Sequence, residues 1–390
     1  MDVPSADVGV ARDVPTADIP RPPPDAPAAD VGVVRDVLTA VDAPGIPADG
    51  GAPGAWELIG NFDNGLWQWG PYLAAAPDGT VYVARSRVGV YRGTLRDGRY
   101  TFDLLPTTGL TNLILSSLGV NDLGEPLLGC WGAMYGASGP GSIFRFNRAA
   151  GSWVASTIPA PGYTRSASDF LVARDGSVFA TGGWAAVLLR STDHGDTFSV
   201  AYNFDAEHPG DRYGFLFSVA VGPGDEMFVG AETASFQHSF DNGRTFTPVD
   251  TAPWGARGNP YGAGFTQSGD ALFSRNIDAD PTKIYRRDAA RGWVRADLGL
   301  ERDDFNHSSI AVWVHNILLA PWGENFIVTG TSIYRSRNGG AWGPFTVGID
   351  TAMYRVVPNA IASDGRCIYV GLQPVAARTD IGAAYRYCGR

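Results

Sequence analysis

Short apolar runs rich in Val, Ile, Tyr and Phe alternate from Trp56 onward with clusters of Gly, Asp, Asn and Pro. Such runs are too short for helices of ordinary length, and β-branched or aromatic residues between turn-forming residues are typical of antiparallel strands. The pattern therefore predicts one all-β domain over residues 55–390.

One unit, a tight turn followed by a strand, recurs along this domain. Its seven copies are Pro77–Val83, Asp122–Leu127, Arg174–Phe179, Pro223–Val229, Ser268–Phe273, Trp322–Ile327 and Ser363–Tyr369. The copies follow one another at about 41 to 55 residues, which suits a four-stranded blade with its loops. We therefore expect a seven-bladed β-propeller of four-stranded antiparallel blades. The small apolar run before each turn, such as Leu73–Ala76, would be the innermost strand, where blades crowd the axis.

The two ends of the domain are complementary. The last repeat lacks a fourth strand, whereas the first is preceded by an extra one at Ala55–Ile59. Pairing that strand with Ala383–Cys388 would close the ring and remove exposed sheet edges. Cys367 and Cys388 would then lie across one hairpin, in a register that allows a disulfide. Cys130 would remain an unpaired, buried apolar residue.

Residues 1–54 differ from the rest. They repeat Asp-Val-Pro and Ala-Asp-Val-Gly-Val units and contain Pro22-Pro23-Pro24. Such a segment cannot bury enough apolar area to offset its backbone entropy. We expect a disordered, Pro/Asp/Ala-rich linker, partly in the polyproline II conformation.

Charge and composition exclude several functions. The net charge is −10, and the linker, with nine Asp and three Arg, carries about −6 of it. Nucleic-acid binding would require the opposite sign. The three Cys and five His lack the close spacing that metal ligands need, so we expect no metal and no cofactor.

The sequence also bears on location. No apolar run approaches the roughly 18 to 20 residues of a membrane-spanning helix, and Met1–Val3 lacks the basic and apolar regions of a signal peptide. We expect no transmembrane segment, and no export signal is present in this sequence.

A second motif occurs between the third and fourth strands of three repeats. Ser191–Phe198 and Ser239–Phe246 both read Ser-x-Asp-x-Gly-x-Thr-Phe, and Ser336–Trp342 is a degenerate copy. Asp can accept hydrogen bonds from turn amides, Gly allows a positive φ, and the aromatic residue packs between sheets. The structural residues would be Ser191, Asp193, Gly195, Thr197, Phe198, Ser239, Asp241, Gly243, Thr245, Phe246, Ser336, Asn338 and Trp342.

These turns resemble the Asp-boxes of the bacterial-neuraminidase-repeat, sialidase-like propeller superfamily. The resemblance implies the propeller fold and places the boxes on the outer rim, so that Asp193, Asp241 and His194 are scaffold. It does not define an activity, because the superfamily includes hydrolases, receptors and assembly factors. The linker resembles those of bacterial envelope lipoproteins, which implies an extracellular or cell-envelope location and a possible lipid anchor in the precursor.

A sialidase-type exo-glycosidase is the alternative that the resemblance raises. It would need an arginine triad, a Tyr and Glu nucleophile pair and an acid/base Asp. The early F/Y-R-I-P segment of sialidases is absent, and Glu125, Glu226 and Glu324 fall in turns on the opposite face. Only Glu207 and Glu232 remain as weak catalytic candidates.

The channel face is the end of the ring formed by the loops that lead into the innermost strands and by those between strands two and three. Aromatic side chains and Arg there can hold sugars or peptides, but aromatics can equally plug the channel of a propeller. The candidate ligand-binding residues are Trp67, Trp69, Tyr72, Tyr163, Arg165, Arg212, Tyr213, Arg257, Tyr261, Tyr354 and Arg355.

The leading hypothesis is a non-enzymatic, monomeric propeller that binds a glycan or a protein partner on this face. A purely structural assembly component is a second alternative, after the glycosidase.

Overall fold

The computed structural model describes residues 54–63, 71–131, 142–159, 167, 169–182, 186–207, 216–222, 225–231, 236–249, 262–274, 284–288, 292–300, 317–329, 332–337, 339–352, 354–374 and 381–389. The predicted linker, residues 1–54, lies outside this part except for Gly54, so its boundary stays a prediction. None of the described residues forms a helix long and apolar enough to cross a membrane.

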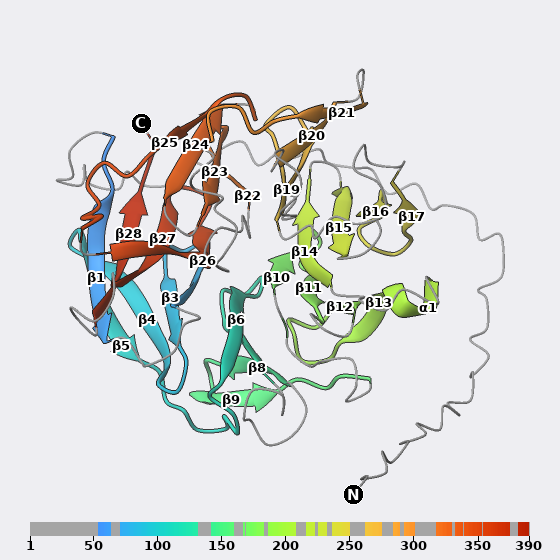
Figure 1. Ribbon diagram of the computed structural model, residues 1–390. Coiled ribbons are helices and arrows are strands. Elements are labelled where there is room, and N and C mark those ends of the chain that lie inside the picture. Colours follow the sequence, from blue (N-terminus) through green and yellow to red (C-terminus); the bar gives the residue numbers. More distant parts are fainter. Residues whose placement is uncertain are drawn as a thin grey trace, which may run out of the picture. The chain divides into compact units, whose positions relative to one another are not determined.

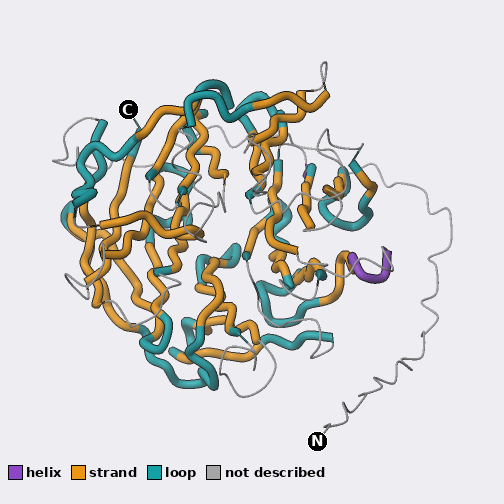
Figure 2. The backbone as a smooth tube through the Cα atoms, viewed as in Figure 1, coloured by secondary structure: helices purple, strands orange, loops and turns teal. Residues whose placement is uncertain are grey.

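The described strands form seven four-stranded antiparallel sheets, which confirms the predicted propeller (Figures 1 and 2). The first blade contains β2 (Tyr72–Ala75), β3 (Val81–Arg85), β4 (Gly89–Arg96) and β5 (Arg99–Leu104). The second contains β6 (Leu115–Val120), β7 (Pro126–Cys130), β8 (Ser142–Asn147) and β9 (Ser152–Ala155). The third contains β10 (Phe170–Val172), β11 (Val178–Thr181), β12 (Val187–Ser191) and β13 (Ser199–Asn203). The next two are β14 (Leu216–Val221), β15 (Met227–Ala231), β16 (Phe236–Ser239) and β17 (Thr247–Pro248); and β18 (Ala263–Phe265), β19 (Ala271–Ser274), β20 (Ile284–Asp288) and β21 (Gly292–Arg295).

The sixth blade contains β22 (Ile317–Leu319), β23 (Glu324–Val328), β24 (Ile333–Arg337) and β25 (Trp342–Pro344), and the seventh β26 (Tyr354–Ser363), β27 (Ile368–Pro374), β28 (Ile381–Tyr387) and β1 (Glu57–Asp63). The helix α1 (Phe204–Glu207) follows β13.

The first strand of each blade is innermost, as the small apolar runs predict. Each innermost strand contacts the next, from β2 through β6, β10, β14, β18 and β22 to β26, which contacts β2 again. Glycine permits the closest approaches: a Cβ on Gly119 in β6 would meet the Phe170 side chain of β10. The tight turn after each innermost strand defines the turn face, at the opposite end of the ring from the channel face.

The seventh blade closes the ring with the N-terminal strand. β1 pairs with β28 in antiparallel register, with Leu58 opposite Tyr385 and Asn61 opposite Ala383. Cys367 and Cys388 form the expected disulfide, with Cα atoms 4.2 Å apart. Cys130 is free and buried, and burial raises the pKa of its thiol to about 12.

The apolar core lies between the blades. The buried apolar side chains of the described residues form seven clusters, one at each junction of neighbouring blades. Every blade thus buries both faces, which explains why its strands read as continuous apolar runs. Trp153 and Trp342 lie in this inter-blade core and are each 3% exposed.

Three tryptophans join neighbouring blades through the same kind of hydrogen bond. The indole Nε1 groups of Trp153, Trp342 and Trp56 donate to the carbonyl oxygens of Pro106, Ala296 and Phe345 at 2.9, 2.6 and 2.8 Å. Each acceptor follows the outermost strand of the preceding blade. Gly109, Gly299 and Gly348 stand in these acceptor segments with φ between +87° and +91°, and a Cβ at any of them would meet the carbonyl oxygen of the corresponding tryptophan.

Candidate functional site

The two full Ser-x-Asp-x-Gly-x-Thr-Phe turns, which resemble Asp-boxes, fold as their residue types predict. Ser191 Oγ contacts Asp193 Oδ1 at 2.7 Å, and the Thr197 amide and hydroxyl donate to Asp193 at 2.8 and 2.5 Å. Asp241 accepts the same bonds from Ser239 and Thr245. Burial opposes the ionisation of Asp241, but the Thr245 hydroxyl and amide, the Ser239 hydroxyl and the Arg244 amide lower its pKa to about 2.

The first box also joins two blades. His194 Nδ1 contacts Asp122 Oδ1 of the preceding blade at 2.7 Å. Arg145 bridges Glu125 and Asp196, with 2.6 Å to a carboxylate oxygen of each. Both boxes therefore use their polar side chains in turn contacts, and the first box also uses them between blades. In the third copy, Trp342 packs as expected, and Asn338 lies outside the described residues.

Most residues predicted for the channel face lie outside the described part of the chain: Trp67, Trp69, Tyr163, Arg165, Arg212, Tyr213, Arg257 and Tyr261. Tyr354 and Arg355 begin β26, where their backbones pair with Pro374 and Gln373. Tyr72 begins β2 and is 6% exposed; its hydroxyl donates to the Leu115 carbonyl at 3.4 Å, and burial raises its pKa. That these residues converge on one binding site at the channel face therefore stays a prediction.

Of the two weak catalytic candidates, only Glu207 is among the described residues. Glu207 ends α1, beyond the outermost strand β13, and is exposed. Glu232 lies outside the described residues. Within the described ranges there is no group of three His, Cys, Asp or Glu residues that could hold a metal ion.

Asp169 is a channel-face carboxyl that the sequence analysis missed. It stands directly before the innermost strand β10, and its Oδ1 accepts the Phe170 amide at 2.9 Å. Burial raises its pKa to about 7, although the Phe170 amide opposes this rise. No cation contacts its carboxylate among the described residues. The signal in the sequence was an Asp directly before an innermost strand, and Asp is equally common there as an ordinary turn residue.

Thr181 adds a second polar group beside Asp169. It ends β11, and its amide donates to the Asp169 carbonyl at 3.1 Å. Its hydroxyl is fully buried and has no hydrogen-bond partner in the described part of the molecule. A buried polar group without a partner is costly unless a ligand or water satisfies it.

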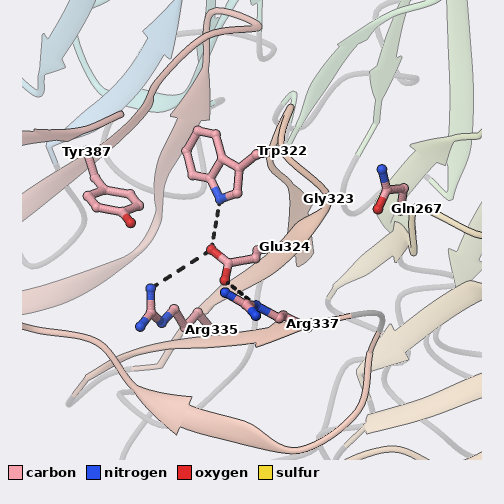
Figure 3. A pocket seen from close by; sticks show the side chains of 7 residues that line it. All are labelled: Gln267, Trp322, Gly323, Glu324, Arg335, Arg337 and Tyr387. Atoms are coloured by element: carbon pink, nitrogen blue, oxygen red, sulfur yellow. Dashed lines mark hydrogen bonds and ion pairs between the residues drawn. The ribbon is translucent and has the colours of Figure 1, made fainter. Parts of the chain in front are cut away.

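A cavity of about 270 Å³ opens on the turn face (Figure 3). Its lining residues are Gln267, Trp322, Gly323, Glu324, Arg335, Arg337 and Tyr387. Glu324 is the centre of this set: it accepts Trp322 Nε1 at 2.8 Å and Arg337 Nε at 3.1 Å, and Arg335 Nη1 lies 4.0 Å away. Sequence reasoning assigned Glu324 to a turn and did not find the cavity.

Comparison with known proteins supports the fold alone. No family model and no curated protein matches the chain. Virginiamycin B lyase from Staphylococcus aureus is 17% identical over 84% of this chain and 99% of its own, with a TM-score of 0.57. The GH74 xyloglucanase from Xanthomonas campestris is 17% identical over 84% of this chain and 55% of its own, with a TM-score of 0.55. YCF48 bound to D1 peptide is 14% identical over 89% of this chain and 98% of its own, with a TM-score of 0.54. By its fold the chain is a seven-bladed β-propeller.

Proposed function

We propose that the protein is a non-enzymatic binding propeller whose channel face takes a protein segment carrying a basic group. Asp169 carries this proposal. A carboxyl that burial holds half-protonated near neutral pH gains most from a cation that arrives with a ligand, because the cation favours the ionised form. A lysine or arginine side chain of a partner supplies that cation, whereas a neutral glycan does not.

Two further observations support the proposal. One solved propeller of similar fold is YCF48 bound to D1 peptide, a precedent for peptide binding on this architecture. The disulfide between Cys367 and Cys388 suits an oxidising compartment. We therefore propose a location outside the cell or in the cell envelope, with residues 1–54 as a spacer.

The raised pKa of Asp169 also favours the glycosidase as a second candidate. A general acid works best with a pKa near the operating pH, and burial supplies that value here. A glycosidase would in addition need a second carboxylate roughly 5 to 10 Å away. Glu232 is the sequence-based candidate for that role.

The test combines binding and turnover on the full chain. An array of basic, acidic and neutral peptides, with a glycan array beside it, would identify the ligand class, and a fluorogenic sialoside would report hydrolysis. We expect binding of basic peptides that Asp169→Asn weakens roughly tenfold or more, the effect of losing a hydrogen bond to a charged group. Asp103→Asn, which changes an exposed carboxyl of β5, should leave the affinity unchanged.

The pH dependence separates the two candidates. Binding of a basic peptide requires the ionised Asp169, so its affinity should rise as the pH increases through about 7. A general acid must be protonated, so kcat would fall over the same range. Glycan binding without basic-peptide binding would reject our choice of partner, and hydrolysis lost in Asp169→Asn would favour the enzyme. The absence of binding on both the peptide and the glycan array would favour a purely structural assembly component.

A further inference from the structure

The turn-face cavity contains one polar group that the fold does not use. Tyr387 is 6% exposed, and its ring packs against Phe345 and Trp322, with centroids 4.7 and 5.5 Å apart. Its hydroxyl lines the cavity and makes no hydrogen bond to any described residue. Figure 3 shows this hydroxyl directed to the side of the cavity on which Arg335 lies.

Arg335 has spare hydrogen-bond capacity beside that hydroxyl. Its guanidinium lies over the Phe345 ring, with Cζ 4.1 Å from the ring centroid, a cation–π contact that helps to hold the group in place. Its separation of 4.0 Å from Glu324 is too long for a hydrogen bond. The guanidinium carries five N–H donors in a fork that fits a carboxylate.

The charges of the lining favour an anion with a neighbouring donor. Arg335 and Arg337 outnumber Glu324, which leaves one positive charge in excess. Glu324 receives one hydrogen bond on each oxygen, from Arg337 and from Trp322, so each oxygen can accept another. A ligand that offers a carboxylate to Arg335 and Tyr387, and a hydroxyl or ammonium to Glu324, would satisfy both sides.

Size and shape limit the ligand further. At about 270 Å³ the cavity falls just below the usual range of small-molecule pockets, about 300–1,000 Å³. The chain at Gly389 covers one face of the Trp322 ring, because a Cβ on Gly389 would meet that ring. One face of the indole is therefore occupied by the chain itself, and the small volume with its charged lining fits a small acid better than a saccharide.

We propose that this cavity is a second ligand site, which binds a small hydroxy or amino acid through Arg335, Tyr387 and Glu324. It lies on the turn face, opposite the channel face, so it is independent of the binding function proposed above. The carboxylate of the ligand accepts from the Arg335 guanidinium and the Tyr387 hydroxyl, and its adjacent hydroxyl or ammonium donates to Glu324.

The experiment is a titration of the full chain by isothermal calorimetry and saturation-transfer NMR. The probes are glycerate, its neutral counterpart glycerol, and serine; glycerate and serine distinguish a hydroxyl from an ammonium donor. We expect saturable binding of at least one acid and none of glycerol. Arg335→Gln and Tyr387→Phe should each weaken binding about tenfold or more.

Two variants keep the test decisive. Tyr387→Phe removes only the hydroxyl and retains the packed ring, so its effect does not depend on folding. Arg366→Gln removes an exposed Arg near another turn and controls for net charge. Binding that Arg366→Gln weakens as much as Arg335→Gln, or the absence of saturable binding by glycerate and serine alike, would overturn the proposal.

Discussion

At the scale of single residues, two carboxyl groups of this protein have opposite environments. Asp241 in the second Asp-box is surrounded by hydroxyl and amide donors, and its pKa falls to about 2. Asp169 at the channel face is half-buried and receives one amide, and desolvation raises its pKa to about 7. The ionised Asp241 carboxylate therefore stabilises the fold, whereas an ionised Asp169 destabilises it. Strongly shifted pKa values of the second kind are common at binding and catalytic sites.

These environments predict opposite pH dependences of stability. In the unfolded chain Asp titrates near 3.9, so the folded state holds the extra proton of Asp169 between about pH 4 and 7, and stability falls as the pH rises through that range. Asp169→Asn should therefore raise Tm at pH 8 relative to the parent and change it little at pH 4. Thermal unfolding followed by circular dichroism measures this difference.

Asp241→Asn is the matched comparison. Its folded pKa lies below the unfolded one, so its stabilisation is present above about pH 4 and disappears as the pH falls toward 2. That variant should lose Tm at pH 8 and approach the parent at pH 2. A gain of Tm in Asp169→Asn at pH 4 equal to that at pH 8 would contradict the burial of the Asp169 charge.

At the scale of the elements, strand and turn patterns predicted much of what the structure contains. The seven tight turns, the innermost small-residue strands and the closing strand follow from local sequence, because strand period and turn chemistry act over a few residues. The hydrogen bonds that join neighbouring blades are harder to predict from the sequence. That Trp153 Nε1 would reach Pro106, 47 residues earlier, depends on the angle between two sheets, which no local pattern encodes.

The two candidate sites were less predictable for the same reason. Asp169 is distinguished by burial rather than by a motif, and the turn-face cavity joins Glu324 to Tyr387, which meet only when the sixth and seventh blades pack together. Sequence reasoning treated Glu324 as a turn residue, which is correct for its backbone. The candidate list for the channel face remains a prediction.

The tryptophan links make a prediction at this scale. Gly109 has a φ of +90°, and a Cβ there would meet the carbonyl oxygen of Trp153, which is backbone and cannot move aside alone. Gly109→Ala should therefore lower the free energy of unfolding by more than the roughly 1 kcal/mol that a positive φ costs a residue with a Cβ. Gly98→Ala is the control, because Gly98 has a φ of +76° and open space around its Cβ position. Equal losses in urea unfolding of the two variants would mean that the blades tolerate a wider junction.

At the scale of the whole molecule, stability depends on closure of the ring. Each core cluster joins only two neighbouring blades, so an open ring would leave one junction unmade and expose the edges of two blades. The closing blade holds the two ends of the domain together: β28 pairs with both β1 and β27. The disulfide between Cys367 and Cys388 joins the turn before β27 to the end of β28, across 21 residues of sequence.

Removal of this disulfide should therefore weaken the closing blade first. Closing a loop of that length is worth about 3 kcal/mol through the entropy of the unfolded chain, so we expect Cys367→Ser with Cys388→Ser to reduce the free energy of unfolding by about that amount in urea. Dithiothreitol should lower the stability of the parent to the same level and leave the double variant unchanged, which separates the disulfide from other effects of the reductant. Hydrogen exchange should show faster opening in β1 and β28 than in β6 or β11, because the bond restrains only the seventh blade. Uniform loss of protection across all blades would mean that the ring unfolds as one unit, with the closing blade no weaker than the others.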